Sequence, residues 1–553
     1  MVVSSRLAPE AARPDPSAAR GVRGTRTRPL VTSPYPRQAS RALLMAAKLR
    51  LPRWDRALEA VEQTQMAQLQ RLVRHAARTE FGHLHGFRGI RTYRDWVGRV
   101  PIGDYDSFFP AIDRMMQGER NILVPEPVRY FGNSSGSSNK GKQKFLPITE
   151  RQVRFQRAMS ADALFRYLSF AEDDDFLTGF TLGLLPPTVM EERGPVYVTN
   201  NPALMFSKIP AFTKPVYLPH GEARVEKDYD RKLTMIAEAY LDHDVRTITG
   251  TTCWFSLLFD KLLEVARRRG RNVDTVSELW PNLDFLIGGG VAADPYLPVI
   301  RERIGRDDVV LVDTYNATEG GLYAVSDHAG EPGMLMIPDR GVFFEFVPVE
   351  DLGKPNPARV PLWGVEKHRN YAIVVTTCSG LYAYKLGDIV RFPSTDPLRM
   401  EFAGRLAGCL STTQELTTHV EIQAAVGRAL ERFGAETVDY AAGADVGVEG
   451  TAKSRYLLFA EFVRPPRDLD GFIRAFDEGL CAENRVYREH RSKDAAILAP
   501  ELHVLPRGSV ERFMRASGRT SVQTKFPRIV DDEGRDLLRT MTRERGGAPA
   551  PSV

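Results

Sequence analysis

A short loop rich in serine, glycine and lysine is the segment of this sequence best suited to chemistry. It runs from Asn133 to Lys144 and holds two glycines, four serines and three lysines in twelve residues. Glycines let a backbone approach a ligand closely, hydroxyl groups donate and accept hydrogen bonds, and lysines bring mobile positive charge. Successive backbone N–H groups in such a loop form a concave nest for anions. The composition therefore predicts a site for the phosphates of a nucleotide.

Two shorter patterns inside this loop require a helix directly after it. Gly136–Lys142 has the spacing of a P-loop, but Gln143 stands where the metal-binding Ser or Thr belongs. Gly132–Gly136 reads G-x-S-x-G, the nucleophile elbow of a hydrolase, with Ser134 as the nucleophile. Lys144–Ile148, which follows, is expected to be extended rather than helical. Both patterns are therefore weaker than the nucleotide interpretation, and a polar surface loop without a ligand is the plain alternative.

Three later segments combine polar side chains with glycine or proline at expected strand ends. They are Tyr315–Gly320, Tyr384–Asp388 and Thr524–Pro527. Taken singly, Glu319 is equally consistent with a surface carboxylate and Asp388 with a turn residue. Ligands of α/β domains gather in the loops at strand ends, so the segments become informative when they are considered together.

Elements of both kinds are needed to position these segments. Strands are expected at Val245–Thr249 and Leu283–Ile287, with an amphipathic helix at Trp254–Arg267 between them. Alternating strands and helices predict an α/β domain, followed by a more β-rich part from about residue 343. Beyond Arg405 the pattern changes to a compact α+β unit. The predicted domains are a disordered basic tail (1–44), a large domain (45–404) and a small mobile C-terminal domain (405–553).

Composition narrows the function classes. The 553 residues contain no apolar run of the roughly 18 residues that a membrane-spanning helix needs. The four cysteines are far apart, which favours a reducing cytoplasm and gives no zinc-binding spacing. The net charge of +5 is misleading, because the first 50 residues alone carry +8 and leave a mildly acidic body. No aromatic residues are interleaved in the basic tail, so nucleic-acid binding is not expected.

In their order and spacing the four segments resemble the adenylate-forming enzymes, and among these the Gretchen Hagen family of auxin-responsive acyl acid amido synthetases. The resemblance covers nearly all of the chain from about residue 54. The family's serine–glycine loop, tyrosine–glutamate motif, tyrosine–glycine–aspartate motif, hinge arginine and late lysine correspond to Ser134-Ser135-Gly136-Ser137-Ser138, Tyr315–Glu319, Tyr384–Asp388, Gly404-Arg405 and Lys525-Phe526-Pro527-Arg528. Thr318 replaces the family's serine. The loop is one residue longer than usual, so Lys140, Lys142 and Lys144 all remain candidates for phosphate contact.

The resemblance implies an adenylate-forming fold and an ATP-dependent ligase. A substrate carboxylate would attack the α-phosphate of ATP to give an acyl adenylate, and an amine, usually an amino acid's, would then form an amide. Preorganised donors and Mg²⁺ would offset the negative charge that this reaction concentrates. Aromatic and aliphatic residues between Phe180 and Phe255 would suit an aryl, indolyl or fatty acid.

The resemblance also implies a role for each site residue. Ser134, Ser135, Gly136, Ser137, Ser138 and Lys144 would hold the β- and γ-phosphates. Tyr315 and Thr318 would bind the nucleotide, with Tyr315 near the adenine, and Asp388 would bind the ribose hydroxyls. Glu319 would ligate Mg²⁺, Lys525 would approach the α-phosphate or the carboxylate, and Arg405 would lie at the pivot between the domains.

Three other functions are carried forward. An acyl-CoA ligase of the same superfamily would share the first half-reaction and use a thiol acceptor. A serine hydrolase would use Ser134 and need no ATP. A non-catalytic protein would bind the nucleotide without turnover. The expected partners are a small carboxylic acid and an amine, with no nucleic acid and no membrane, and the oligomeric state is left open with a monomer as one option.

Overall fold

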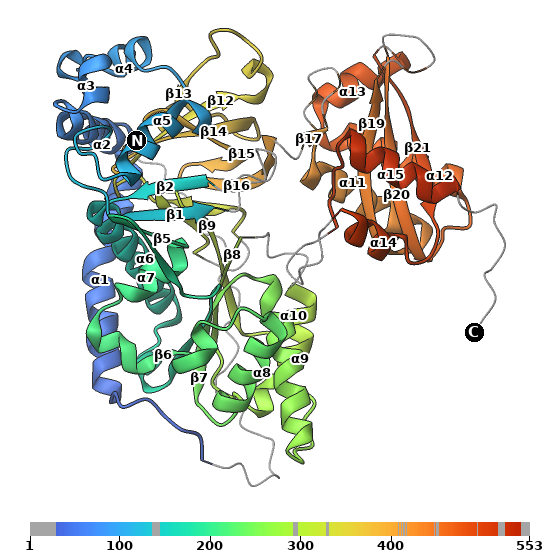
Figure 1. Cartoon of the computed structure of the whole chain (residues 1–553). Coiled ribbons are helices and arrows are strands. Elements are labelled where there is room, and N and C mark those ends of the chain that lie inside the picture. Colours follow the sequence, from blue (N-terminus) through green and yellow to red (C-terminus); the bar gives the residue numbers. More distant parts are fainter. Residues whose placement is uncertain are drawn as a thin grey trace, which may run out of the picture.

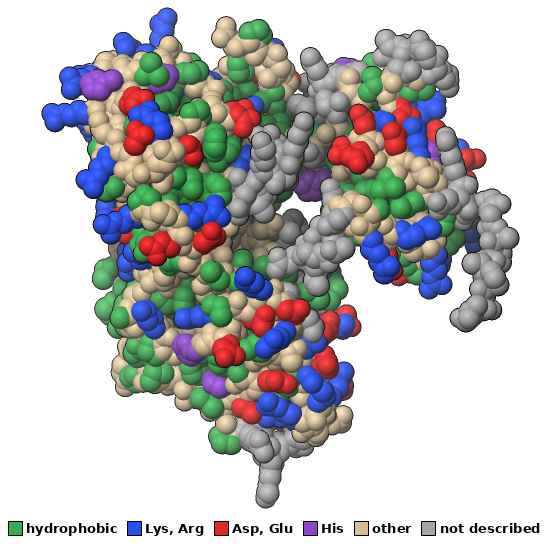
Figure 2. Space-filling view, viewed as in Figure 1, with side chains coloured by type: hydrophobic (Ala, Val, Ile, Leu, Met, Phe, Trp, Pro, Cys, Tyr) green, Lys and Arg blue, Asp and Glu red, His purple; other side chains and the backbone are tan. Residues whose placement is uncertain are grey.

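The computed structural model describes residues 29–134, 144–290, 297–327, 331–406, 409–410, 412, 415, 417–446, 448, 453–494, 496–517 and 526–543. These residues form a large N-terminal body and a smaller C-terminal unit beside it (Figure 1). Within the described ranges, no helix is both long enough and apolar enough to cross a membrane. Figure 2 shows lysine and arginine side chains interspersed with aspartate and glutamate on the face in view.

A mixed sheet runs through the large body, with twelve strands among the described residues. Strands β6, β3, β7, β8 and β9 pair in parallel, whereas every pair from β9 onward is antiparallel. In spatial order the strands are β13 (Val360–Pro361), β12 (Val342–Pro348), β14 (Asn370–Thr377), β15 (Tyr384–Thr395), β16 (Leu398–Arg405), β11 (Met334–Met336), β10 (Gly321–Val325), β9 (Val310–Ala317), β8 (Phe285–Gly289), β7 (Val245–Gly250), β3 (Phe180–Leu184) and β6 (Tyr217–Leu218).

A second sheet carries the start of the serine–lysine loop. Its order is β2 (Lys144–Ile148), β1 (Tyr130–Ser134), β5 (Val196–Thr199) and β4 (Met190–Arg193). The expectation that Lys144–Ile148 is extended is confirmed, because this segment forms β2. The helix α6 (Glu150–Ala171) follows directly, and the side chain of Thr149 caps its first turn.

Helices cover the sheet where their apolar faces can be buried. The helices α8 (Tyr229–Tyr240), α9 (Cys253–Arg268) and α10 (Leu297–Ile304) lie beside the parallel strands (Figure 1). Their inner residues share one apolar core with β3, β6, β7 and β8. The remaining helices of the body are α1 (Arg37–Glu59), α2 (Val61–Ala76), α3 (Glu80–Leu84), α4 (Tyr93–Arg99), α5 (Tyr105–Met116) and α7 (Asn201–Ser207).

The N-terminal part differs from the sequence prediction. Residues 37–44, which the prediction placed in a disordered tail, form the first turns of α1, where Ser40 is fully buried. Helix α1 ends just before Ala60, and α2 begins just after it. Residues 1–28 of the predicted tail lie outside the described residues.

The small unit is built on a three-stranded sheet of β19 (Glu436–Val446), β20 (Ser454–Arg464) and β21 (Ile497–Leu505). A short ladder, β17 (Cys409–Leu410) with β18 (Thr417–Thr418), leads into it. Its helices are α11 (His419–Phe433), α12 (Leu469–Glu483), α13 (Arg485–Arg491), α14 (Ser509–Ala516) and α15 (Asp532–Arg543). Helix α15 was not predicted from the sequence, and Leu538 and Met541 bury its inner face.

Candidate active site

The turn that carries Glu319 lies where the large sheet changes from parallel to antiparallel pairing. It joins the end of β9 to the start of β10, and Glu319 is 9% exposed. Two glycines follow, and Gly321 has a φ of +106°. A Cβ at Gly320 would lie 2.7 Å from the Tyr323 ring, and one at Gly321 would lie 2.5 Å from Cγ of Gln156. Only glycine fits these two positions, so the sequence dictates a tight turn that fixes the carboxylate.

Tyr315 and Asp388 meet although 73 residues separate them. The Tyr315 hydroxyl donates a 2.7 Å hydrogen bond to Oδ2 of Asp388, and both side chains are 7% exposed. Burial raises the pKa of Tyr315 well above its ordinary value, and the neighbouring Asp388 carboxylate raises that pKa further. The hydroxyl therefore stays protonated and remains a donor. Both residues were expected at strand ends, and Tyr315 lies near the end of β9 and Asp388 near the start of β15.

The hinge arginine lies directly opposite this aspartate. In the antiparallel ladder of β15 and β16, Asp388 is the Cα partner of Arg405. The preceding Gly404 has a φ of +136°, and a Cβ there would lie 2.9 Å from Cβ of Thr418 in β18. The chain thus passes from the site strand to the small unit at a glycine that tolerates no side chain. The side chain of Arg405 is outside the described part.

The serine–lysine loop starts beside the Glu319 turn. A Cβ on Gly132 would lie 2.4 Å from Cγ2 of Thr318, so β1 runs directly against this turn. Ser134 ends β1 as the Cα partner of Lys144, and the Lys144 ammonium lies 5.4 Å from the centre of the Tyr105 ring. Three of the four predicted segments therefore meet. Lys525 of the fourth lies outside the described residues, as do Ser135, Gly136, Ser137, Ser138, Lys140 and Lys142.

The residues present fit a polyphosphate with a hard metal ion. Glu319 supplies a carboxylate, and Oε1 of Gln152 and the hydroxyl of Tyr323 are buried beside the turn with no hydrogen-bond partner among the described residues. Buried polar atoms without partners are unusual and mark places where a polar ligand or water completes the structure. No cluster of three or more acidic, histidine or cysteine ligands occurs in the described ranges. A Mg²⁺ ion at Glu319 would therefore take its other ligands from phosphate and water, as Mg²⁺ usually does.

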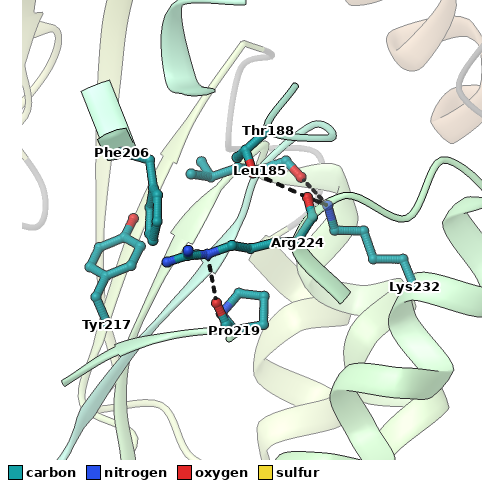
Figure 3. A pocket seen from close by; sticks show the side chains of 8 residues that line it. Leu185, Thr188, Phe206, Tyr217, Pro219, Arg224 and Lys232 are labelled. Carbon is teal, nitrogen blue, oxygen red and sulfur yellow. Dashed lines mark hydrogen bonds between the residues drawn. The ribbon is translucent and has the colours of Figure 1, made fainter. Parts of the chain in front are cut away.

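A narrow pocket lies at the far edge of the parallel strands, within the range 180–255 where an acid pocket was expected (Figure 3). The Arg224 guanidinium lies 3.7 Å from the centre of the Phe206 ring, and its Nε donates to the Pro219 carbonyl at 3.1 Å. The Tyr217 ring packs edge-on against Phe206. As it stands, the pocket has room for about one water molecule.

A buried lysine forms the opposite wall of this pocket. Lys232 is 2% exposed, and its ammonium donates to the Leu185 carbonyl at 2.7 Å. Burial lowers the pKa of Lys232 to about 8. Within the described ranges neither Lys232 nor Arg224 forms an ion pair with a carboxylate, so the pocket has an excess of positive charge. Neither residue was predicted to have a role, because a lone lysine or arginine carries no motif.

Models of the three GH3 domains, the Gretchen Hagen family, match this chain. The GH3 family N-terminal domain matches residues 50–185, the central domain 335–405 and the C-terminal domain 420–534. Together these matches cover more than half of the chain. They contain the serine–lysine loop, the Asp388 strand and Lys525, which the sequence analysis had assigned to one site.

Curated relatives match over most of their length. An indole-3-acetic acid-amido synthetase, GH3.3 of Arabidopsis thaliana, is 23% identical over 82% of this chain and 86% of its own. The jasmonoyl–L-amino acid synthetase JAR4 of Nicotiana attenuata is 23% identical over 86% of this chain and 92% of its own.

Solved structures share the fold. The AtGH3.15 acyl acid amido synthetase in complex with 2,4-DB superposes with a TM-score of 0.67 at 19% identity, over 92% of this chain and 97% of that one. An open conformation of 2-hydroxyisobutyryl-CoA ligase superposes with a TM-score of 0.52 at 12% identity, over 86% of this chain and 92% of that one. The fold is therefore the adenylate-forming fold, as predicted. The chain belongs to the GH3 family and is an acyl acid–amino acid ligase that forms amides through an adenylate.

Proposed function

We propose that this protein joins a small carboxylic acid to the amine of an amino acid at the site around Glu319 and Asp388. An oxygen of the acid attacks the α-phosphorus of ATP, and the bond to pyrophosphate breaks. The amine nitrogen then attacks the acyl carbon, AMP leaves, and the nitrogen loses a proton. The observation that carries the proposal is the meeting of Gly132, Thr318 and the Tyr315–Asp388 pair at the point where the sheet changes direction.

Each site residue has a proposed task within this reaction. Asp388 accepts hydrogen bonds from the ribose hydroxyls, and Tyr315 holds this carboxylate in place from the neighbouring strand. The contact of Tyr315 with adenine stays a prediction. Glu319 holds Mg²⁺, which offsets phosphate charge when it is bound. Ser134 and Lys144 belong to the phosphate loop, and the tasks of Ser135, Gly136, Ser137, Ser138 and Lys525 remain as predicted.

The hinge has a proposed task of its own. Arg405 leaves the large body opposite Asp388, so rotation at Gly404 would move the small unit relative to the ribose site. Such a rotation would bring Lys525 to the reacting groups and keep water from the adenylate. The proposed domains are therefore a large body up to about residue 404 and a small mobile unit after it. The proposed location of the reaction is the cytoplasm.

The pocket of Arg224 is the proposed place for the far end of the acid. The segment that carries the pocket residue Thr188 connects to the site through β5. In β5, Thr199 is the Cα partner of Gly132 and donates a 2.9 Å hydrogen bond to the carbonyl of Val189, which follows Thr188. Adjacent strands lie about 4.8 Å apart, so the pocket wall is within a few strand widths of the Thr318 turn. Admission of an acid would require Arg224 to move away from Phe206.

A release assay tests the proposed function. The purified full chain is incubated with ATP, Mg²⁺ and a panel of carboxylic acids crossed with amino acids, and pyrophosphate release is measured. Pyrophosphate release that depends on an acid, with an amide product of the expected mass, supports the proposal. A thioester formed only with CoA would indicate an acyl-CoA ligase instead. Hydrolysis without ATP, abolished by Ser134→Ala, would indicate a serine hydrolase, although strand β2 rather than a helix is the next described element after Ser134.

A further inference from the structure

A chain of hydrogen bonds connects residues in or near the serine–lysine loop, the Glu319 turn and the Asp388 strand. The Thr149 N–H donates to Oγ of Ser379 at 3.0 Å, and the Thr149 hydroxyl lies 3.0 Å from the same oxygen. The Gln152 N–H then donates to the Thr149 hydroxyl at 3.2 Å. Finally, Nε2 of Gln152 donates to the Thr318 carbonyl at 2.9 Å. We refer to Ser379, Thr149, Gln152 and Thr318 as the polar relay.

The members of the polar relay belong to three different elements, because Thr149 and Gln152 both lie at the start of α6. Ser379 lies in the turn between β14 and β15, ahead of the strand that carries Asp388. Thr149 caps α6 directly after the strand that leaves the serine–lysine loop. Thr318 precedes Glu319 in the chain. The relay therefore fixes the phosphate loop and the ribose strand relative to the peptide group that joins Thr318 to Glu319.

Burial makes the relay rigid. Ser379 and Gln152 are 0% exposed and Thr149 is 2% exposed, so water does not compete for the bonds among these three residues. The bond from Gln152 to the half-buried Thr318 is partly buried. Hydrogen bonds in a low-dielectric interior are electrostatically stronger than those in water. The Thr318 carbonyl held by Gln152 sets the plane of the following peptide bond, because that bond is planar. The starting direction of the Glu319 side chain follows from this plane.

Packing alone does not require the polar amide group of Gln152 at this buried position. Its Oε1 is buried without a partner in the described ranges, and an unsatisfied buried acceptor costs stability that an apolar side chain of similar length would not. The other amide atom, Nε2, makes a side-chain bond of Gln152 to the site, the bond to Thr318.

We propose that Gln152 is a positioning residue that acts through Thr318 to aim Glu319 at the metal of the nucleotide, and that Thr149 and Ser379 hold Gln152 in place. This inference rests on the proposed function, because it assumes that Glu319 binds Mg²⁺. It adds a residue on α6 for which the sequence carries no motif. The relay does no chemistry itself and touches no reacting atom.

The test uses two matched variants on one helix. Gln152→Met removes the donor and keeps the length of the side chain. Gln156→Met makes the same change one turn later, at a side chain that is also buried (3% exposed) and whose amide atoms have no hydrogen-bond partner within the described part of the chain. Thr149→Val and Thr149→Ser form a second pair, because valine removes the hydroxyl and serine keeps it.

Two readouts are measured on the full chain without any acid substrate. The first is the Mg²⁺ concentration that gives half-maximal binding of a non-hydrolysable ATP analogue, measured by titration calorimetry. We expect about a fivefold increase for Gln152→Met and Thr149→Val, and less than twofold for Gln156→Met and Thr149→Ser, in keeping with the loss of one hydrogen bond. The second is hydrogen–deuterium exchange of residues 315–325 without nucleotide, which we expect to become faster only in Gln152→Met and Thr149→Val.

The outcomes separate the two proposals. If the wild-type chain binds no ATP analogue at any Mg²⁺ concentration, the proposed function fails, and exchange at residues 315–325 still tests the relay. If the wild type binds and Gln152→Met matches Gln156→Met in both readouts, the positioning role is overturned. If all four variants lower Tm equally and leave the Mg²⁺ midpoint unchanged, the relay is only structural and the inference is wrong.

Discussion

The Glu319 turn and the Arg224 pocket lie on the same sheet and are built in opposite ways. At the turn, backbone geometry determines the positions, because Gly132, Gly320 and Gly321 leave no room for a Cβ. At the pocket, side chains determine the shape: Arg224 covers an aromatic ring and Lys232 fills the back wall. The first region is proposed to serve the step that adenylate-forming enzymes share, and the second is proposed to select the individual acid.

This difference explains which region can vary. A backbone turn held by glycines changes little unless a glycine is replaced, so it suits chemistry with one required geometry. A pocket lined by long side chains changes shape with a single substitution. The predictions below test this division, since changes at the turn should stop the reaction and changes at the pocket should alter only preference or stability.

The largest effect is expected at Glu319. Glu319→Ala removes the carboxylate proposed to hold Mg²⁺, and we expect acid-dependent ATP–pyrophosphate exchange to fall about 1,000-fold, the upper range for loss of one preorganised electrostatic group. Exchange is measured with isotopically labelled pyrophosphate. Glu150→Ala, an exposed glutamate at the start of α6, serves as the control. Near-normal exchange in Glu319→Ala would contradict the metal role. The proposed contrast between the Glu319 turn and the Arg224 pocket would then no longer hold.

A smaller effect is expected at the ribose contact. Asp388→Ala should raise the ATP KM about tenfold and change kcat little, because a ribose contact made in both ground and transition states is uniform binding. Tyr315→Phe removes only the hydroxyl that donates to Asp388. It should raise the same KM by less, about threefold, as expected for one lost hydrogen bond. Steady-state kinetics with varied ATP measure both values, and an unchanged KM in Asp388→Ala would remove the assignment.

The sequence predicted the backbone-built region better than the side-chain-built one. The expected helix at Trp254–Arg267 is found as Cys253–Arg268, because its apolar spacing is regular. The meeting of Tyr315 with Asp388 followed from family resemblance. Gln152 was missed because a buried glutamine leaves no periodic signal. Helix α15 was missed because its few apolar residues, Leu538 among them, are separated by charges.

A modest effect is expected at Arg224. Arg224→Gln removes the guanidinium from the Phe206 ring and opens the narrow pocket. We expect kcat/KM for bulkier acids to rise relative to small acids by about fivefold, within the range that one pocket contact usually contributes. The ATP KM should stay unchanged. Arg369→Gln is the matched control, because Arg369 also lies over an aromatic ring, that of Tyr371, on the antiparallel part of the sheet. An altered ATP KM with unaltered acid preference would place Arg224 outside the acid pocket.

The smallest effect concerns stability and its pH dependence at Lys232. Burial lowers the pKa of this lysine to about 8 in the folded protein from an ordinary value of 10.5. The unfolded chain therefore binds more protons between these two pH values, and the free energy of unfolding rises with pH across that window. Glu226 opposes the shift, but burial outweighs it. Below pH 8 the folded protein carries the full cost of a buried charge, on the order of 3 kcal/mol.

Lys232→Met removes that cost together with the hydrogen bonds to Leu185 and Arg224, which do not change with pH in the same way. The Tm of the variant relative to wild type should therefore be highest below pH 8 and fall steadily as the pH approaches 10, whatever the constant offset between them. Lys227→Met, which changes an exposed lysine just before α8, should show no such trend. A pH-independent difference for Lys232→Met would mean that the lysine keeps its ordinary pKa because a ligand or water compensates its charge. In that case the pocket would already provide an anion-binding environment, and it would resemble the Glu319 turn in being shaped for a charged group.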